Sequence, residues 1–203
     1  MSPFFESIRF QNGEFSLLDY HEDRLNRTRR EVLGLKNTLK LSSILKEVPD
    51  TDELYKCKVS YGDQIDEVIF TPYKPALQRA VRLVEVNKYQ YSYKSSDREF
   101  IQNQVAMSGC DDIIMLKNGF LTDASYSNLA LFDGEKWVTP ATYLLPGVKR
   151  RFLLDQTFLK PENIHVDDLK NYSKLTFINA MRDFELVYRF EIKENSTLIT
   201  SLL

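Results

Sequence analysis

Hydrophobic and polar residues alternate at the start of the chain in a pattern that predicts a β-hairpin followed by a helix. Residues Phe4–Phe10 alternate and are rich in aromatic and β-branched side chains, and Asn12-Gly13 separates them from a second apolar run. Apolar runs on both sides of Asn-Gly are a strong hairpin signal. Asp19, with Glu22 three residues later, resembles a helix start, and a basic amphipathic helix is expected to end near Leu33.

The rest of the chain is rich in short strands with turn signals between them. Asn118-Gly119 and Asp133-Gly134 mark two of the turns, and Gly109 is expected to end a helix. Three further helices are expected, at 42–48, 98–107 and 148–157. The stretches expected to form strands are 55–61, 66–70, 80–86, 112–116, Leu121 with its neighbours, 129–132, 164–166, 175–178 and 186–192.

This order of elements predicts an α+β fold built from hairpins and meanders, with no regular βαβ repeat. The chain has 203 residues, enough for one large domain or two small lobes. A change of pattern near residue 86 predicts a smaller α+β lobe at 1–86 and a larger lobe at 87–203.

Composition and charge exclude several classes of function. The net charge is −2 and no long basic run is present, so nucleic acid is not an expected partner. No apolar stretch approaches the roughly 18 residues of a membrane span, and the first residues lack the features of a signal peptide. Cys57 and Cys110, the only cysteines, fit a reduced cytoplasm better than a disulfide framework.

Metal-ligand spacing and the common nucleotide and hydrolase motifs are absent from the sequence. His21 and His165 are the only histidines, and no cluster has the spacing of a zinc site, so no metal is expected. The chain contains no G-x-S-x-G, G-x-x-x-x-G-K or G-x-G-x-x-G string. Serine hydrolase, P-loop and Rossmann interpretations therefore have no support.

A polar elbow between two predicted strands holds the most informative residues of the chain. Asp123, Ser125, Ser127 and Asn128 fall within six positions between apolar runs. These residue types also suit an ordinary capped turn, so the elbow alone leaves a structural and a functional interpretation open.

Four blocks of sequence, taken in order, resemble the class IV aminotransferase family. Each block is a weak signal alone, but the ordered set spans most of the chain. Asp123 stands where the family has Glu. The blocks are Phe5-Glu6-Ser7-Ile8-Arg9, His21-Glu22-Asp23-Arg24-Leu25, the elbow through Asn128 with Thr139-Pro140, and Leu145-Pro146-Gly147-Val148-Lys149-Arg150.

The resemblance implies a two-lobed fold-type-IV enzyme, like D-amino-acid aminotransferase, that uses pyridoxal 5'-phosphate (PLP). It also implies a small amino substrate and a homodimer. The chain starts at the first family hairpin and lacks the segment that usually precedes it. A degenerate relative that binds PLP without catalysis therefore remains an alternative.

Carried over position by position, the resemblance assigns roles to individual residues. Lys94, in Lys94-Ser95-Ser96-Asp97, is the expected catalytic lysine that holds the cofactor covalently, with Lys88 as the alternative. Asp123 is expected to face the pyridine nitrogen. Arg24 is expected to grip the phosphate.

Six further residues are expected to bind the cofactor. The backbone amides of Val148 and Lys149 open a predicted helix and suit a phosphate. Ser127 and Asn128 are expected to line the cofactor, and Asn179 and Ala180, in a stretch similar to that of aminodeoxychorismate lyases, to close the phosphate cup.

The reaction predicted from the resemblance is that of an aminodeoxychorismate lyase, which yields 4-aminobenzoate and pyruvate. Arg98 and the stretch Asn179-Ala180-Met181 favour the lyase-type relatives. Amino-acid transamination, of the branched-chain or D-amino-acid type, is the alternative reaction, although no clamp for the carboxylate of a 2-oxo acid is evident.

Overall fold

The chain divides into two compact units. The computed structural model describes residues 2–46, 48–182, 184, 186–193 and 196–203. The first unit comprises Met1–Pro75 and Tyr93–Asp97, and the second comprises Ala76–Ser92 and Arg98–Leu203. The boundary predicted at residue 86 differs from this division because the strand at 80–85 pairs within the second unit, while a short return segment joins the first.

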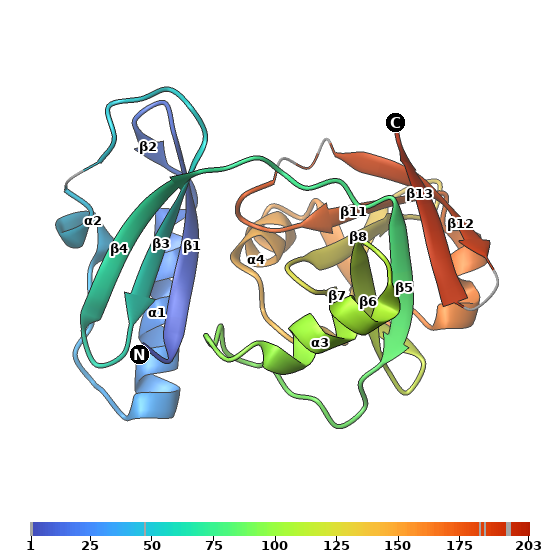
Figure 1. Ribbon diagram of the computed structural model, residues 1–203, viewed down its shortest axis with the longest axis horizontal. Coiled ribbons are helices and arrows are strands. Elements are labelled where there is room, and N and C mark those ends of the chain that lie inside the picture. Colours follow the sequence, from blue (N-terminus) through green and yellow to red (C-terminus); the bar gives the residue numbers. More distant parts are fainter. Residues whose placement is uncertain (1, 47, 183, 185, 194–195) are drawn as a thin grey trace. The chain divides into compact units, whose positions relative to one another are not determined.

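The first unit is a small antiparallel sheet covered on one face by a helix. Its sheet has the strand order β2-β1-β3-β4, and Figure 1 shows α1 running along one face. The elements are β1 (Phe4–Gln11), β2 (Glu14–Phe15), α1 (Leu18–Leu33), α2 (Leu41–Ile44), β3 (Tyr55–Tyr61) and β4 (Ile65–Pro72).

Strict alternation along β1 explains why this sheet buries one face. Phe4, Ile8 and Phe10 are buried, whereas every second residue between them is only half-buried. Phe4 and Ile8 pack with Leu25 of α1 and with Val59 of β3 in one core cluster. A strand with this period of two presents a single apolar face to the helix, as the sequence pattern requires.

The predicted hairpin and helix are confirmed, but the predicted helix start is wrong. Asn12 has a φ of 51° and Gly13 of 76°, the left-handed pair expected of a tight Asn-Gly turn. Leu17, not Asp19, is the N-cap, and it makes no side-chain capping bond. Glu22 instead accepts a hydrogen bond from the backbone N–H of Leu41 at 2.8 Å, because the helix is anchored by tertiary contacts.

The second unit is larger and mainly strand. Its helices are α3 (Glu99–Ser108), α4 (Val148–Asp155) and the 3-10 helix η1 (Val166–Asn171). Its strands are β5 (Ala80–Glu85), β6 (Asp112–Lys117), β7 (Phe120–Ala124), β8 (Asn128–Phe132), β9 (Trp137–Pro140), β10 (Leu159–Glu162), β11 (Lys174–Ile178), β12 (Val187–Lys193) and β13 (Thr197–Leu202).

These strands form one sheet that closes on itself. The strand order is β10-β9-β8-β11-β12-β13-β5-β6-β7, and an additional pairing joins β7 to β8. This pairing closes the strands from β8 round to β7 into a barrel, with β9 and β10 extending from β8. Closure removes exposed sheet edges and encloses a core.

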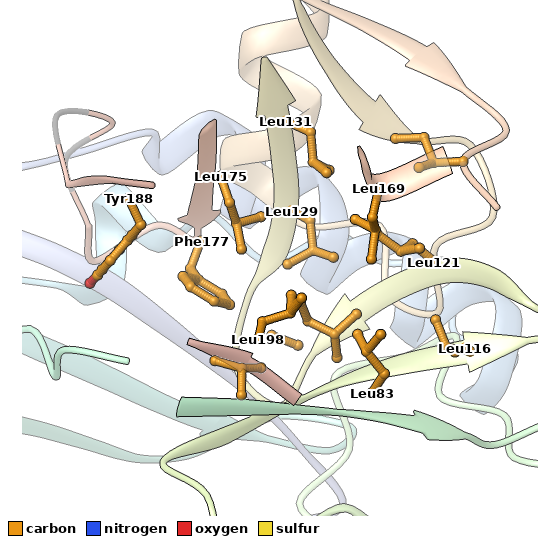
Figure 2. Close-up of a cluster of buried hydrophobic side chains, with 14 of the residues drawn as sticks. Leu83, Leu116, Leu121, Leu129, Leu131, Leu169, Leu175, Phe177, Tyr188 and Leu198 are labelled. Atoms are coloured by element: carbon orange, nitrogen blue, oxygen red, sulfur yellow. The ribbon is translucent and has the colours of Figure 1, made fainter. Parts of the chain in front are cut away.

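The core of the second unit lies between the strands of this barrel. Figure 2 shows leucine side chains packed in one cluster, with Phe177 and Tyr188 at its left side. Leu129 and Leu131 of β8 are fully buried there. Burying a side chain of this size contributes roughly 1.5–3 kcal/mol, so the cluster is a main source of the unit's stability.

The predicted α+β class is confirmed, with three local differences. The stretch 164–166 forms only an isolated bridge to Phe120, and the strand in this region is β10 instead. Strand β13 was not predicted. Two pairs of strands, β5–β6 and β9–β10, are parallel. A parallel pair needs a crossover connection, and α3 supplies it for β5–β6 and α4 for β9–β10.

A substitution at Gly119 tests how the second Asn-Gly turn meets its neighbour. Gly119 has a φ of 78°, and an added Cβ would lie 2.2 Å from Nε2 of His165. Gly119→Ala is expected to cost more than the roughly 1–2 kcal/mol of left-handed strain alone. The free energy of unfolding, measured with urea, checks this.

The matched controls separate strain from collision. Gly13→Ala, at a φ of 76° with no atom within 4 Å of the added Cβ, should show strain only. In a His165→Ala background the extra cost at Gly119 should disappear. Equal costs in both backgrounds would contradict the collision.

Candidate active site

The carboxylate of Asp123, on β7, is buried and held by three hydrogen bonds. Its Oδ2 accepts the backbone N–H of Leu144 at 3.1 Å and of Leu145 at 2.8 Å, and its Oδ1 accepts Nδ2 of Asn128 at 2.7 Å. Burial raises the pKa of Asp123 to about 6, although these bonds and the charge of Arg150 act to lower it. Within the described residues no cationic side chain forms a salt bridge with this carboxylate.

Asn128 supports Asp123 and holds the loop that follows β9. The two residues are directly paired between β7 and β8, and Asn128 Nδ2 also donates to the carbonyl of Leu145 at 2.9 Å. A Cβ added to Gly147 would lie only 2.0 Å from Oδ1 of Asn128. Glycine at 147 is therefore required for this close approach, and Asn128 acts by positioning the carboxylate and the loop.

Arg98 braces the elbow between β7 and β8. Its guanidinium donates to the carbonyl of Ser125 and, at 3.2 Å, to the hydroxyl of Tyr91. The same guanidinium lies 4.2 Å from the centre of the Tyr126 ring. Arg98 is buried, so its role within this unit is to hold the elbow.

Asn179, at the end of β11, holds the same elbow from another side. Its Nδ2 donates to the Tyr126 carbonyl at 3.2 Å and to Oγ of Ser127 at 3.0 Å. Its Oδ1 accepts the backbone N–H of Met181 at 2.9 Å. Ser127 and Asn179, both predicted as site residues, are thus brought together. Half-buried Ala180 follows Asn179 in a turn.

The start of α4 lies next to Asn128 through Gly147, which is its N-cap. Val148 is buried, Lys149 reaches over the Phe152 ring at 5.6 Å, and no side chain caps the helix. The first N–H groups of a helix have no partner within it and carry partial positive charge. The amides of Val148 and Lys149 therefore suit an anion.

Arg24, on α1 in the first unit, forms a buried ion pair. Its Nε donates to Oε1 of Glu6 at 2.9 Å, and its Nη2 donates to Oε2 of the same carboxylate. His21 Nδ1 lies 2.7 Å from Oε2. Burial alone would raise the pKa of Glu6, but the charge of Arg24 and these hydrogen bonds outweigh it and lower the pKa to about 2.

His21 is uncharged at neutral pH in this cluster. Burial lowers its pKa, against the opposing effect of Glu6, and the charges of Arg24 and Lys94 lower it further. Its Nε2 is buried and has no hydrogen-bond partner in the part of the chain that the structure describes. Glu6 and His21 had no predicted role, although both lie in the blocks that resemble the family.

Lys94 lies in the return segment of the first unit, along the edge of β1. Its carbonyl accepts the N–H of Phe5 at 3.1 Å, and its Nζ lies 4.6 Å from the centre of the Phe5 ring. Lys88, the alternative lysine, is exposed in a turn of the second unit. The first unit therefore holds Lys94 and Arg24, and the second holds all the other predicted site residues.

The sequence matches the model of the family "Amino-transferase class IV" over residues 3–185. The chain belongs to this family. Class IV aminotransferases use PLP, so the chain is a PLP-dependent enzyme, and the fold-type-IV architecture expected from the sequence is confirmed.

The chain is similar to two proteins that it matches over nearly their whole length. A protein of uncharacterised function from Haemophilus influenzae is 32% identical over 186 residues, which is 89% of this chain and 98% of that protein. The crystal structure of a candidate 4-amino-4-deoxychorismate lyase from Haemophilus somnus 129PT has a TM-score of 0.83 and 28% identity. The likeness covers 89% of this chain and 97% of that one.

A more distant likeness shows the fold alone. A hypothetical aminotransferase from Mycobacterium tuberculosis, in a form with PLP bound, has a TM-score of 0.71 and 15% identity, covering 89% of this chain and 78% of that one.

The side chains of this chain fit PLP by their chemistry. A protonated pyridine nitrogen suits a buried carboxylate that has no salt-bridge partner in the described part of the chain, and Asp123 is such a group. Helix-start amides suit the phosphate. No group of three or more metal-ligating side chains is found among the described residues, and no described helix is long and apolar enough to cross a membrane.

The pH dependence of stability without cofactor tests the state of Asp123. Because its pKa rises from 3.8 to about 6 on folding, the folded state holds the proton more tightly than the unfolded state. Stability should therefore fall as pH rises from about 4 to about 6, by an amount on the order of 3 kcal/mol, and level off above. Relative to wild type, Asp123→Asn should lack this fall in thermal melting.

A half-buried aspartate provides the matched control. Hydrogen bonds from the N–H groups of Lys136 and Glu135 lower the pKa of Asp133, so Asp133→Asn should retain the wild-type fall at Asp123. If Asp123→Asn and wild type showed parallel stability profiles over this range, the raised pKa would be refuted.

Proposed function

We propose that the chain catalyses an aminodeoxychorismate lyase-type elimination that yields 4-aminobenzoate and pyruvate. The observation that carries this proposal is the 28% identity and TM-score of 0.83 to the candidate lyase of Haemophilus somnus, across 97% of that chain. The Asn179 contacts with the elbow support it, because the stretch that resembled lyases packs beside the predicted site residues.

In the proposed function three side chains have distinct roles. Lys94 is the catalytic residue that holds the cofactor covalently. Asp123 faces the pyridine nitrogen. Arg24 binds the phosphate, and its ion pair with Glu6 orients its guanidinium.

The remaining predicted residues contribute contacts of two kinds. The amides of Val148 and Lys149 bind the phosphate. Ser127, Asn128, Asn179 and Ala180 line the cofactor, and the hydrogen bonds of Asn128 and Asn179 also set the shape of the elbow.

PLP, when bound, supplies an electron sink next to the carbon that carries the substrate's amino group. Lys94 takes the proton from that carbon as general base. The C–O bond at the neighbouring ring carbon would then break, the leaving group would take up a proton to become pyruvate, and the ring would become aromatic. Asp123, when ionised, would favour a protonated pyridine nitrogen.

We further propose that the enzyme acts on a small amino compound as a homodimer in the cytoplasm. Cys57 and Cys110 are both free thiols, which supports a reducing compartment. Sedimentation of the PLP-loaded protein tests the dimer, which a monomer at micromolar concentration would contradict.

Reduction of the PLP-loaded protein with borohydride tests the lysine. Peptide mass spectrometry should find the pyridoxyl group on Lys94 and not on Lys88. Lys94→Ala should abolish the label and lower product formation by about 10²–10⁴-fold, the usual contribution of a proton-transfer group.

A pair of assays then tests the reaction. The loaded enzyme should release 4-aminobenzoate and pyruvate from aminodeoxychorismate, and Lys88→Ala should leave this release unchanged. Amino transfer to 2-oxoglutarate without 4-aminobenzoate would replace the lyase with a transaminase. A label on Lys94 with neither activity would indicate a binding protein.

A further inference from the structure

The side chain of Tyr126 is exposed at the tip of an elbow whose other side chains are buried. Its exposed fraction is 61%, whereas its neighbours Ser125 and Ser127 are buried. The N–H of Ala124 donates to the Ser127 carbonyl at 2.8 Å, so Ser125 and Tyr126 form the tip of a tight turn. Turn positions favour Gly, Asn, Asp, Ser and Pro. The turn itself therefore does not explain a large aromatic ring at position 126.

Hydrogen bonds hold the backbone on both sides of this ring. The guanidinium of Arg98 donates to the Ser125 carbonyl, and Nδ2 of Asn179 donates to the carbonyl of Tyr126 at 3.2 Å. A tyrosine on a fixed backbone offers a large contact area and loses little conformational freedom when a ligand packs on it. The ring of Tyr126 is thus presented in the way that suits a ligand contact.

A buried cation lies behind the ring. The guanidinium of Arg98 lies 4.2 Å from the centre of the Tyr126 ring, and Arg98 is itself buried. Among the described residues no carboxylate forms a salt bridge with Arg98, and its Nε has no hydrogen-bond partner. Arginine keeps its positive charge in proteins. The guanidinium covers one face of the ring, which leaves the opposite face for a ligand.

The chemistry of this arrangement favours a flat and negatively charged ligand. Aromatic rings pack on one another in offset or edge-to-face geometry, with a gain beyond simple burial. The positive charge behind the ring adds an attraction for an anion. Tyr126 follows Asp123 by three positions, and Asp123 pairs directly with Asn128 at the base of the elbow. A ligand on the Tyr126 ring would therefore lie close to the residue proposed to face the cofactor.

We propose that Tyr126, with Arg98 behind its ring, is a specificity-determining residue that selects substrates with a planar, negatively charged ring. The inference rests on the proposed function, because it names the part of the substrate that packs on the elbow of the same site. Aliphatic amino compounds present no flat surface to Tyr126 and lack this contribution. The selection is therefore for ring carboxylates over aliphatic carboxylates.

Two carboxylates of equal charge and similar size measure this selection. Benzoate is planar, and cyclohexanecarboxylate is not. Titration calorimetry of the PLP-loaded protein should give a dissociation constant for benzoate about threefold to tenfold below that for cyclohexanecarboxylate, the usual contribution of one aromatic pair. Neutral benzamide should bind more weakly than benzoate, because it lacks the charge that Arg98 attracts.

Substitutions at two tyrosines locate the contact. Tyr126→Leu should bring the ratio of the two dissociation constants close to one, and Tyr126→Phe keeps the ring and should keep the wild-type ratio. Tyr143 is the matched control, since its exposed ring also lies 4.2 Å from a buried guanidinium, that of Arg150. Tyr143→Leu should keep the wild-type ratio. General damage to the site weakens both ligands alike, so the ratio reports the ring itself.

The outcomes separate this selection from the proposed function. Equal or undetectable binding of the two carboxylates by wild type, or an unchanged ratio in Tyr126→Leu that thermal melting shows to be folded, would overturn the role of Tyr126. A ratio lost only in Tyr143→Leu would also overturn it. A ratio that depends on Tyr126, in a protein that releases no 4-aminobenzoate from aminodeoxychorismate, would support the selection and refute the lyase.

Discussion

The organisation of the polar residues in the second unit depends on the buried carboxylate of Asp123. An ionised carboxylate in the interior is costly unless hydrogen bonds or a cation compensate it. Here the compensation comes from Asn128 and two backbone amides, so the strand pair and the loop after β9 are held around one group. Asn128 in turn requires glycine at 147, and Gly147 begins α4. The hydrogen bonds of the Asp123 carboxylate and of Asn128 thus fix where α4 begins.

Glu6 in the first unit has the opposite electrostatic environment. Both carboxylates are buried, but Arg24 pairs with Glu6 and lowers its pKa, whereas no described cation pairs with Asp123 and its pKa is raised. Groups whose surroundings move their pKa values apart are suited to different roles. Glu6 is a permanent counter-charge that orients Arg24, and Asp123 has capacity left for a cationic ligand group.

Features that depend on local sequence were predictable, and those that depend on distant pairing were not. The Asn12-Gly13 and Asn118-Gly119 turns need left-handed backbone that few other pairs adopt, so the sequence identified them. The start of α1 was misjudged because Leu17 caps it without a side chain. The unit boundary and strand β13 follow from pairing with β5, which no local pattern reveals.

The candidate site was predictable as a set of positions but not as a set of contacts. Asp123, Ser127 and Asn128 were found because the elbow concentrates polar residues between apolar strands. The backbone amides of Leu144 and Leu145 carry no side-chain signal, so the partners of Asp123 stayed hidden. Asn179 was found through a motif, yet spacing alone does not show that its amide holds the elbow.

The contacts of Arg98 and Asn179 bear on the choice between elimination and amino transfer. Arg98 and Asn179 favoured a lyase as residues of a motif, but their hydrogen bonds are made to the elbow. In the proposed function they would therefore act on the reaction through the shape of the elbow. One fold supports several reactions, and function resides in the groups that touch the substrate. In the proposed function, Lys94 would take the substrate's proton in either reaction. Elimination would follow if the neighbouring carbon loses its leaving group, and amino transfer if the proton is returned to the cofactor.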